Sequence, residues 1–485
     1  MRYAINSMEA IGFGLALCLI VSFTACGGSS SQSASNSGNS NGIATTVNIT
    51  ISDPHTCSGP SGLFAHIYIT VTDVQIHASS TAGPNDPGWV DLTPNLKNNP
   101  LQIDLLAQAN NQCFLASLGS TTELQPGSYQ QIRVFLAPNT VSVPRNQCDV
   151  TANCVMLSAN PGRPLPLNLS SESQTGIKIP SGQIAGGQFT IAAGQTKDLN
   201  IDFDACGSIV SQGNGQYRLK PVLHAGEVVL TSTSINGTVI DSVTGHAING
   251  GVTVVALEQK DSGGVDRVVM ETIADASGNF VFCPVPAGSY DVVAAAVNGA
   301  GTAYAATVIT GVQPGNALGT VPLVAETGPN TSSASIMGQV TTSTGSAGTS
   351  ADIVLSALQP VQINGSQVMV TIPLASQSMA TAIVSTASGT GCPTNTECVS
   401  YTFAIPALNP SVGAFSTSGH QQPAPPTPGP VDYAIDAQAV ILGSGGILDC
   451  SPSDLQTSTK SSGGSLSVTA GGTVTASTLA FTGCQ

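Results

Sequence analysis

Short stretches in which apolar and polar residues alternate recur along the 485-residue chain, and they constrain its fold more than any other feature. In His66–Thr72 every second residue is apolar, which is the spacing of a strand with one buried face. Val74 and Ile76 continue the pattern on the opposite parity. One extra residue in the strand would produce this shift, so the sequence predicts a β-bulge near Thr72–Asp73.

Turn signals such as Pro126–Gly127 separate the strand-like runs, and long helical periodicity is scarce. Further strand-like runs lie at residues 131–136, 199–203 and 252–257, and one short helix is expected near 105–110. The predicted fold class is therefore all-β, with three tandem β-sandwich domains behind an N-terminal leader.

Scarcity of charge limits the partners that the chain can have. Charged residues make up 8% of it, against roughly 25% in an ordinary soluble protein. The formal net charge is −15, and the 12 Lys and Arg residues form no cluster of the kind that displaces counterions from phosphates. The composition excludes a basic nucleic-acid binder, a coiled coil and a charge-rich disordered chain.

The first 25 residues have the pattern of an export signal. Arg2 precedes an apolar run over residues 10–23, which is short of the roughly 20 residues that span a bilayer. The run ends in Phe23-Thr24-Ala25-Cys26, which resembles the lipobox of bacterial lipoprotein signals. The resemblance implies cleavage before Cys26 and fatty acyl chains such as palmitate on that residue. The alternative is an ordinary secretory signal in which Cys26 is incidental.

Residues 26–44 are rich in Ser, Gly and Asn, which predicts a flexible tether between the lipid and the first folded domain. Gly27 stands where many lipoproteins held at the inner membrane have Asp. The resemblance therefore implies a lipid-anchored location in the cell envelope, at the outer membrane.

Ten cysteines remain once Cys18 leaves with the signal and Cys26 takes lipid, and an even number in an exported chain predicts disulfides. The expected pairs are Cys148 with Cys154, Cys392 with Cys398, Cys450 with Cys484, and Cys57 with Cys113. Cys206 and Cys283 either bridge two domains or stay free. Zinc is disfavoured because no C-x2-C pair occurs.

Several stretches of the first folded region, about residues 45–230, follow one family pattern. They are Ile51-Ser52-Asp53-Pro54, residues 68–76, 124–133 and 175–179, Asp202-Phe203-Asp204, and residues 217–221. With these stretches the region resembles the lipoprotein-borne family catalogued as domain of unknown function 4382. The resemblance implies an exported β domain with no assigned chemistry, and it gives no disulfide pairing.

A second region, residues 233–326, has its own pattern. It contains Gly237-Thr238-Val239, residues 248–252, Asp275, residues 278–282 and Gly288-Ser289-Tyr290. With these it resembles carboxypeptidase regulatory-like domains, which are prealbumin-type sandwiches of the carbohydrate-binding-like fold group. Asp275 and Gly278 suit a tight turn, and Phe280 and Phe282 point to one face of the following strand. We interpret these residues as scaffold.

The third region, residues 333–485, is β-patterned and matches no family that we can name. A Pro-rich stretch at 421–430 is either a rigid loop or a boundary between half-domains. The two disulfides predicted for the third region favour a single β-sandwich that both bonds crosslink.

Motifs for catalysis are weak. Residues 38–42 match G-x-S-x-G but lie in the tether, where no strand–turn–helix elbow can form. Zinc-protease, P-loop and dinucleotide motifs are missing from the sequence, its six histidines are scattered, and we expect no cofactor. Asp202 and Asp204 share one face of a strand. They are either weak calcium candidates or solvated, hydrogen-bonded carboxylates.

Ligand candidates are few because sugar rings stack on exposed aromatic side chains and the chain has a single Trp. Trp89 either anchors an edge strand under a turn-rich loop or offers a ligand platform. Tyr68 and Tyr304 are weaker candidates.

The sequence favours a non-catalytic, lipid-anchored cell-envelope protein with binding or structural β-sandwich modules, whose ligand is a glycan or an envelope protein. One alternative is an accessory glycan-binding lipoprotein of a polysaccharide-degrading system, which would need exposed aromatics in a groove. The other is a hydrolase, which a buried His–carboxylate–hydroxyl cluster in a cleft would favour.

Overall fold

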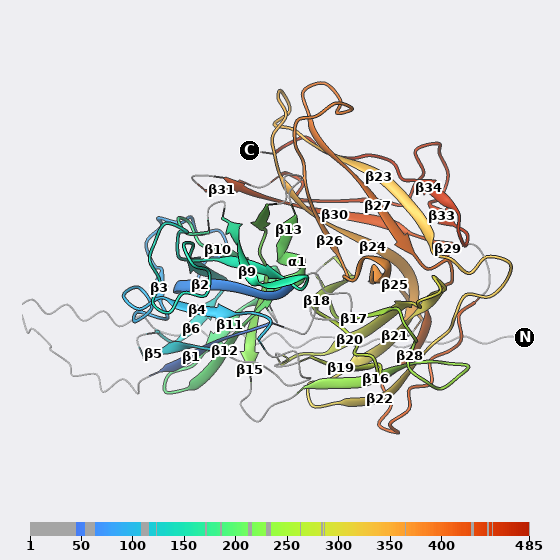
Figure 1. Ribbon diagram of the computed structural model, residues 1–485, viewed down its shortest axis with the longest axis horizontal. Coiled ribbons are helices and arrows are strands. Elements are labelled where there is room, and N and C mark those ends of the chain that lie inside the picture. Colours follow the sequence, from blue (N-terminus) through green and yellow to red (C-terminus); the bar gives the residue numbers. More distant parts are fainter. Residues whose placement is uncertain are drawn as a thin grey trace, which may run out of the picture. The chain divides into compact units, whose positions relative to one another are not determined.

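The computed structural model describes residues 45–53, 64–107, 116–122, 124–169, 172–184, 187–211, 216–228, 234–261, 263–282, 285, 287–363, 365–427, 431–443, 446–448 and 450–484. All of them belong to one compact unit, Ile43–Gln485. Strands dominate these residues, and the helical elements among them are single turns: α1 at Ala205–Ser208, η1 at Ser181–Gln183 and η3 at Ala375–Gln377 (Figure 1). The predicted all-β class is confirmed. Cys26, with the signal and the tether around it, lies outside the described residues.

The first region packs two main sheets around one core. A four-stranded sheet has the order β15-β12-β1-β5, with β1 at Thr46–Ser52, β5 at Ala116–Thr121, β12 at Thr196–Asp204 and β15 at Val222–Val228. A nine-stranded sheet has the order β10-β7-β2-β8-β9-β14-β13, with β3 and β4 also paired to β2. Its strands are β2 at Phe64–His77, β3 at Val90–Asp91, β4 at Leu101–Asp104, β7 at Gln131–Leu136, β8 at Cys154–Leu157, β9 at Asn160–Asn168, β10 at Ile177–Pro180, β13 at Ile209–Ser211 and β14 at Tyr217–Leu219. A small pair joins β6 at Gly127–Tyr129 to β11 at Phe189–Ile191. Ile49 of β1 and Ile69 of β2 are fully buried in the common core.

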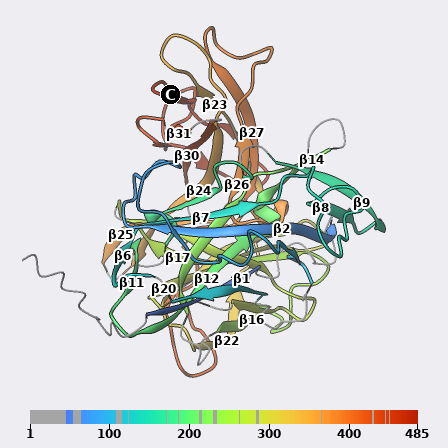
Figure 2. The same ribbon diagram turned by 90° about the vertical axis from the view of Figure 1, so that its left-hand side faces the viewer.

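The bulge predicted in the first strong strand is confirmed. Where β2 pairs with β7, the register shifts between Val71 and Asp73, and Figure 2 shows the two strands side by side. Because of this extra residue, Val74 and Ile76 remain fully buried although their parity has changed.

The helix expected near 105–110 is not formed over its first three residues. Leu105–Ala107 form a turn directly after β4, and residues 108–110 lie outside the described residues. The Leu106 amide donates to Asp104 Oδ1 at 3.1 Å, which is how an Asp side chain stabilises a turn at a strand end.

An eleven-stranded sheet extends through the second and third regions. Its order is β28-β21-β20-β17-β18-β25-β24-β30-β31, with β26 also paired to β24 and β32 to β30. The strands from the second region are β17 at Val252–Lys260, β18 at Val265–Ile273, β20 at Tyr290–Val297 and β21 at Ala303–Val312. Those from the third are β24 at Asp352–Ile363, β25 at Ser366–Thr371, β26 at Ala382–Ser385, β28 at Ser411–Ala414, β30 at Ala434–Gly443, β31 at Gly446–Leu448 and β32 at Asp454–Thr457.

Two parallel pairings join these regions into one sheet. β18 pairs with β25, and β21 pairs with β28. One core cluster also spans both regions, with Ala256 and Val293 from the second and Ile353 and Phe403 from the third. The regions 233–326 and 333–485 thus share both a sheet and a core.

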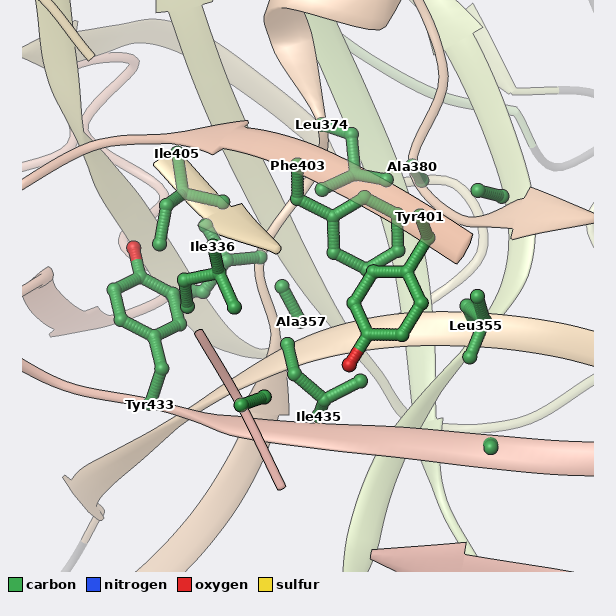
Figure 3. Close-up of a cluster of buried hydrophobic side chains, with 14 of the residues drawn as sticks. Ile336, Leu355, Ala357, Leu374, Ala380, Tyr401, Phe403, Ile405, Tyr433 and Ile435 are labelled. Carbon is green, nitrogen blue, oxygen red and sulfur yellow. The ribbon is translucent and has the colours of Figure 1, made fainter. Parts of the chain in front are cut away.

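Smaller sheets complete both regions. In the second, β16 at Ile235–Asp241 lies between β19 at Asn279–Phe282 and β22 at Ala317–Leu323. In the third, β23 at Ala334–Thr342 pairs with β27 at Glu397–Ile405, β34 at Thr473–Thr475 and β35 at Leu479–Phe481, and β29 at Val431–Asp432 pairs with β33 at Ser467–Val468. Figure 3 shows the apolar contact between the sheet of β23 and β27 and the eleven-stranded sheet. Ile336 of β23, Phe403 of β27 and Ile435 of β30 point toward one another.

The turn predicted in the second region forms as expected. Asp275 Oδ1 accepts from the amides of Ser277 and Asn279, at 2.8 and 2.9 Å. Gly278 has a φ of 82°, and a Cβ there would lie 2.2 Å from a backbone oxygen, so only glycine fits. Phe280 and Phe282 are both buried, on one face of β19.

Three of the expected cysteine pairs are bonded: Cys148–Cys154, Cys392–Cys398 and Cys450–Cys484. Cys57, Cys113 and Cys283 lie outside the described residues, as does the side chain of Cys206. Among the residues that the structure describes, no helix has the length and apolar character needed to span a bilayer.

Candidate functional site

A cavity of about 450 Å³, lined by both polar and apolar side chains, lies where strands of all three regions meet. The first region contributes β10, β12, β15 and η1, the second contributes β17 and β18, and the third contributes β24, β25 and β30. β12 lies against β18, and α1, which follows β12, lies against β26 of the third region. The volume is that of a typical small-ligand site, roughly 300–1,000 Å³.

Strand alternation places two acids on the wall of this cavity. Asp202 and Asp204 lie two residues apart in β12, and Phe203 between them is fully buried in the core of the first region. Asp202 lies opposite Ser52 of β1 on one side and opposite His224 of β15 on the other. The predicted shared face of the two acids is therefore formed.

Asp202 and His224 each bury a polar atom without a hydrogen-bond partner among the described residues. The Ser52 hydroxyl donates to Asp202 Oδ1 at 3.5 Å, whereas Oδ2 has no donor. His224 Nδ1 likewise has no partner. Burial lowers the pKa of His224 to about 4, so its imidazole is neutral at pH 7. Burial, followed by the charge of Asp204, raises the pKa of Asp202 well above its usual value.

A third acid reaches the cavity from the second region. Glu271 of β18 is 3% exposed, and its Oε2 accepts from the Ala380 amide at 2.8 Å. Burial raises its pKa most, and the charges of Asp204 and Asp202 raise it further. The acids of β12 and β18 are thus close enough to influence one another.

The rest of the wall offers hydrogen-bonding groups and two bases. Its side-chain amides and hydroxyls belong to Gln183, Gln259, Gln438, Ser356, Thr371, Thr381 and Ser453. The bases are Lys260 and Arg267, and Arg267 forms ion pairs with Asp261, Asp436 and Asp454. The cavity can therefore donate and accept hydrogen bonds on several sides.

The calcium interpretation gains no support. Calcium takes six to eight oxygen ligands. The described residues hold no group of three or more His, Cys, Asp or Glu that could bind a metal ion.

Trp89 lies away from the cavity, in a cluster that fixes a loop. Its indole nitrogen donates to the Gly83 carbonyl at 2.9 Å. The guanidinium carbon of the buried Arg133 lies 4.8 Å from the centre of its ring, and the His77 ring lies 5.0 Å away. These contacts match the interpretation of Trp89 as the anchor of an edge strand under a loop.

The two tyrosine candidates lie outside the cavity as well. Tyr68 is half-buried and stacks on His66, with ring centres 5.6 Å apart. Tyr304 is only 4% exposed and donates to Asp241 Oδ2 at 2.8 Å. Because a stacking platform needs an open ring face, this burial disfavours Tyr304 as a ligand platform.

Sequence reasoning singled out Asp202 and Asp204 but missed His224 and Glu271. A signal for Glu271 was available, because it is an acid inside the apolar run 268–273. His224 had no such signal, since its place opposite Asp202 depends on the pairing of β12 with β15, which are not consecutive strands.

The buried acids predict that the protein is most stable at mildly acidic pH. Burial raises the pKa of Asp266 to about 7 and that of Asp73 to about 6. Their contribution to stability is complete below the unfolded-state pKa of about 4 and is lost as the pH rises through the folded-state values. His224 acts oppositely, because its stabilising contribution is lost as the pH falls from about 6.5 toward 4. Urea unfolding should give a free energy about 2 kcal/mol higher near pH 5 than near pH 8.

Asp266→Asn should flatten this pH dependence, because it removes the group with the higher of the two values. A free energy of unfolding that climbs steadily up to pH 8 would contradict the prediction.

Comparison with solved structures gives only distant likenesses. The Bacillus anthracis TIE protein shares 8% identity over 90% of this chain, with a TM-score of 0.14, and this chain spans half of that protein's length. A streptococcal ancillary pilin shares 11% identity over 78% of this chain and 99% of its own, with a TM-score of 0.15. The minor pilin of Streptococcus agalactiae shares 11% identity over 52% of this chain and 96% of its own, with a TM-score of 0.16. Likeness this weak identifies neither a shared fold nor a function.

No curated protein matches the chain in sequence. Residues 44–221 match the family described as "Domain of unknown function (DUF4382)", nearly the region for which the sequence predicted it. The chain therefore carries a DUF4382 domain, and this domain supplies Asp202 and Asp204 to the cavity wall.

Proposed function

We propose that this protein is a non-catalytic, lipid-anchored protein of the cell envelope that binds a carbohydrate in the cavity between its three β regions. The observation that carries the proposal is the cavity itself, of about 450 Å³, with amides, hydroxyls and carboxyls on its wall. A carbohydrate presents hydroxyls that both donate and accept, and such a wall can satisfy them. Recognition would rest on hydrogen bonds, since no aromatic residue is among the described residues of the wall.

The lipobox-like sequence ending at Cys26 supports the proposed location. We propose anchorage at the outer membrane, with residues 26–44 as a tether. We also propose that residues 233–326 form a carboxypeptidase regulatory-like scaffold. The tight turn at Asp275–Gly278 and the buried Phe280 and Phe282 support that assignment.

One observation favours a hydrolase as a second candidate: His224, Asp202 and several hydroxyls line the same cavity. Two features weaken it. His224 Nδ1 has no hydrogen-bond partner among the described residues, so neither Asp202 nor a hydroxyl orients the imidazole through that atom. Burial lowers the pKa of His224 to about 4, far below the value near 7 that suits a general base. Binding is therefore the function that the geometry favours.

A glycan array probed with the purified protein tests the proposal. We expect binding of one class of glycan, and Thr381→Trp should weaken it at least about tenfold by filling the cavity. Thr190→Trp, at an exposed position of β11, is the matched control and should bind normally. Equal binding by both variants would exclude the cavity, and hydrolysis of the bound glycan would favour the hydrolase.

A further inference from the structure

The acids of the cavity wall differ in their partners: Asp261 pairs with Arg267, whereas Asp202 and Glu271 take part in no ion pair of the described residues. Of the two bases on the wall, Arg267 is engaged by three other carboxylates. The charge of Lys260 lowers the pKa of Asp266 and of Asp291. The wall therefore has an excess of acidic groups at the place where β12 meets β18.

A second observation, which does not depend on the number of acids, indicates a ligand that donates hydrogen bonds. The side chain of Asp202 is only 4% exposed, yet its Oδ2 accepts no hydrogen bond among the described residues. His224, a neutral base on the same wall, buries Nδ1 without a partner. Buried polar atoms without partners are rare in folded proteins, because leaving them unsatisfied costs free energy. A ligand that donates hydrogen bonds would satisfy both atoms.

We infer that the carbohydrate bound in this cavity carries a protonated primary amine, as an amino sugar does, and that Asp202, Glu271 and His224 receive it. This inference rests on the proposed function. An ammonium group has three donors and a positive charge, which suits two carboxylates and one imidazole nitrogen. The hydroxyls of the sugar would then contact the amides and hydroxyls of the remaining wall.

The behaviour of the acids agrees with this assignment. Burial raises the pKa of both Asp202 and Glu271. A cation beside a carboxyl group favours its ionised form, so binding of the amine should release protons.

Isothermal titration of the full chain, purified in detergent, with glucosamine, N-acetylglucosamine and glucose tests the inference. These probes share the ring and differ in whether position two carries a charged amine, a neutral amide or a hydroxyl. We expect glucosamine to bind at least about tenfold more tightly than the other two. Asp202→Asn and Glu271→Gln should each abolish that preference. Asp198→Asn, the same change at an earlier position of β12 that does not line the cavity, should keep it.

The comparison of the three sugars in the unmodified protein does not depend on how any variant folds. Equal binding of all three would overturn the inference and leave the proposed carbohydrate site standing. Binding of none, at millimolar concentration and with no binder on the glycan array, would overturn both.

Discussion

Replacing Cys26 with serine should abolish incorporation of a labelled fatty acid and move the protein from the membrane fraction to the soluble fraction. Each buried methylene of an acyl chain contributes about 0.8 kcal/mol to membrane binding, and more than one chain makes the anchorage durable. The thiol of Cys26 is the attachment point that the lipobox-like sequence implies. Loss of that single sulfur should therefore remove the whole anchor. Fractionation and fatty-acid labelling of cells that produce the variant measure the effect.

Cys18→Ser is the matched control, because Cys18 lies inside the apolar run and should not receive lipid. This variant should remain labelled and membrane-bound. Labelling of Cys26→Ser at the level of the unmodified protein would refute the assignment of the anchor.

Replacing Arg267 with alanine should destabilise the protein by about 3–5 kcal/mol, the usual cost of removing one partner of a buried ion pair. Arg267 of β18 contacts Asp436 of β30 with both terminal nitrogens, and its Nη2 lies 2.6 Å from Asp454 of β32. It thereby connects the second region to the third. The side chain of Asp436 is only 2% exposed, so the variant would leave a buried carboxylate without its partner. Urea unfolding at pH 7 measures the loss.

Two further variants show whether the lost free energy of unfolding comes from the unpaired buried charge or from truncation of the side chain. Asp436→Asn combined with Arg267→Ala should recover part of the lost free energy, because the buried charge is gone. Arg163→Ala removes an exposed arginine that forms no ion pair among the described residues, and it should change stability by less than about 0.5 kcal/mol. A loss below about 1 kcal/mol for Arg267→Ala would show that this cluster does not hold the two regions together.

Local features of the chain were predictable from sequence. The bulge at Thr72–Asp73 follows from a change of parity within one strand, and the turn at Asp275–Gly278 follows from residue types that tolerate it. The loop disulfides Cys148–Cys154 and Cys392–Cys398 follow from short spacings. Each of these depends on neighbours within a few residues. The expected helix near 105–110 failed at its start for a local reason too, since Asp104 stabilises a turn there.

Only the tertiary structure determined how the regions join. The parallel pairing of β18 with β25 uses backbone groups. Because every exposed strand edge offers the same groups, no residue pattern predicts this pairing. The cavity has the same origin, because Asp202, His224 and Glu271 come from three strands that the chain brings together over long sequence separations. The sequence by itself determined the strands, the turns and the loop disulfides, because each depends on residues close together in the chain. The shared sheet and the cavity depend on which exposed strand edges pair with one another, and only the folding of the whole chain determines that.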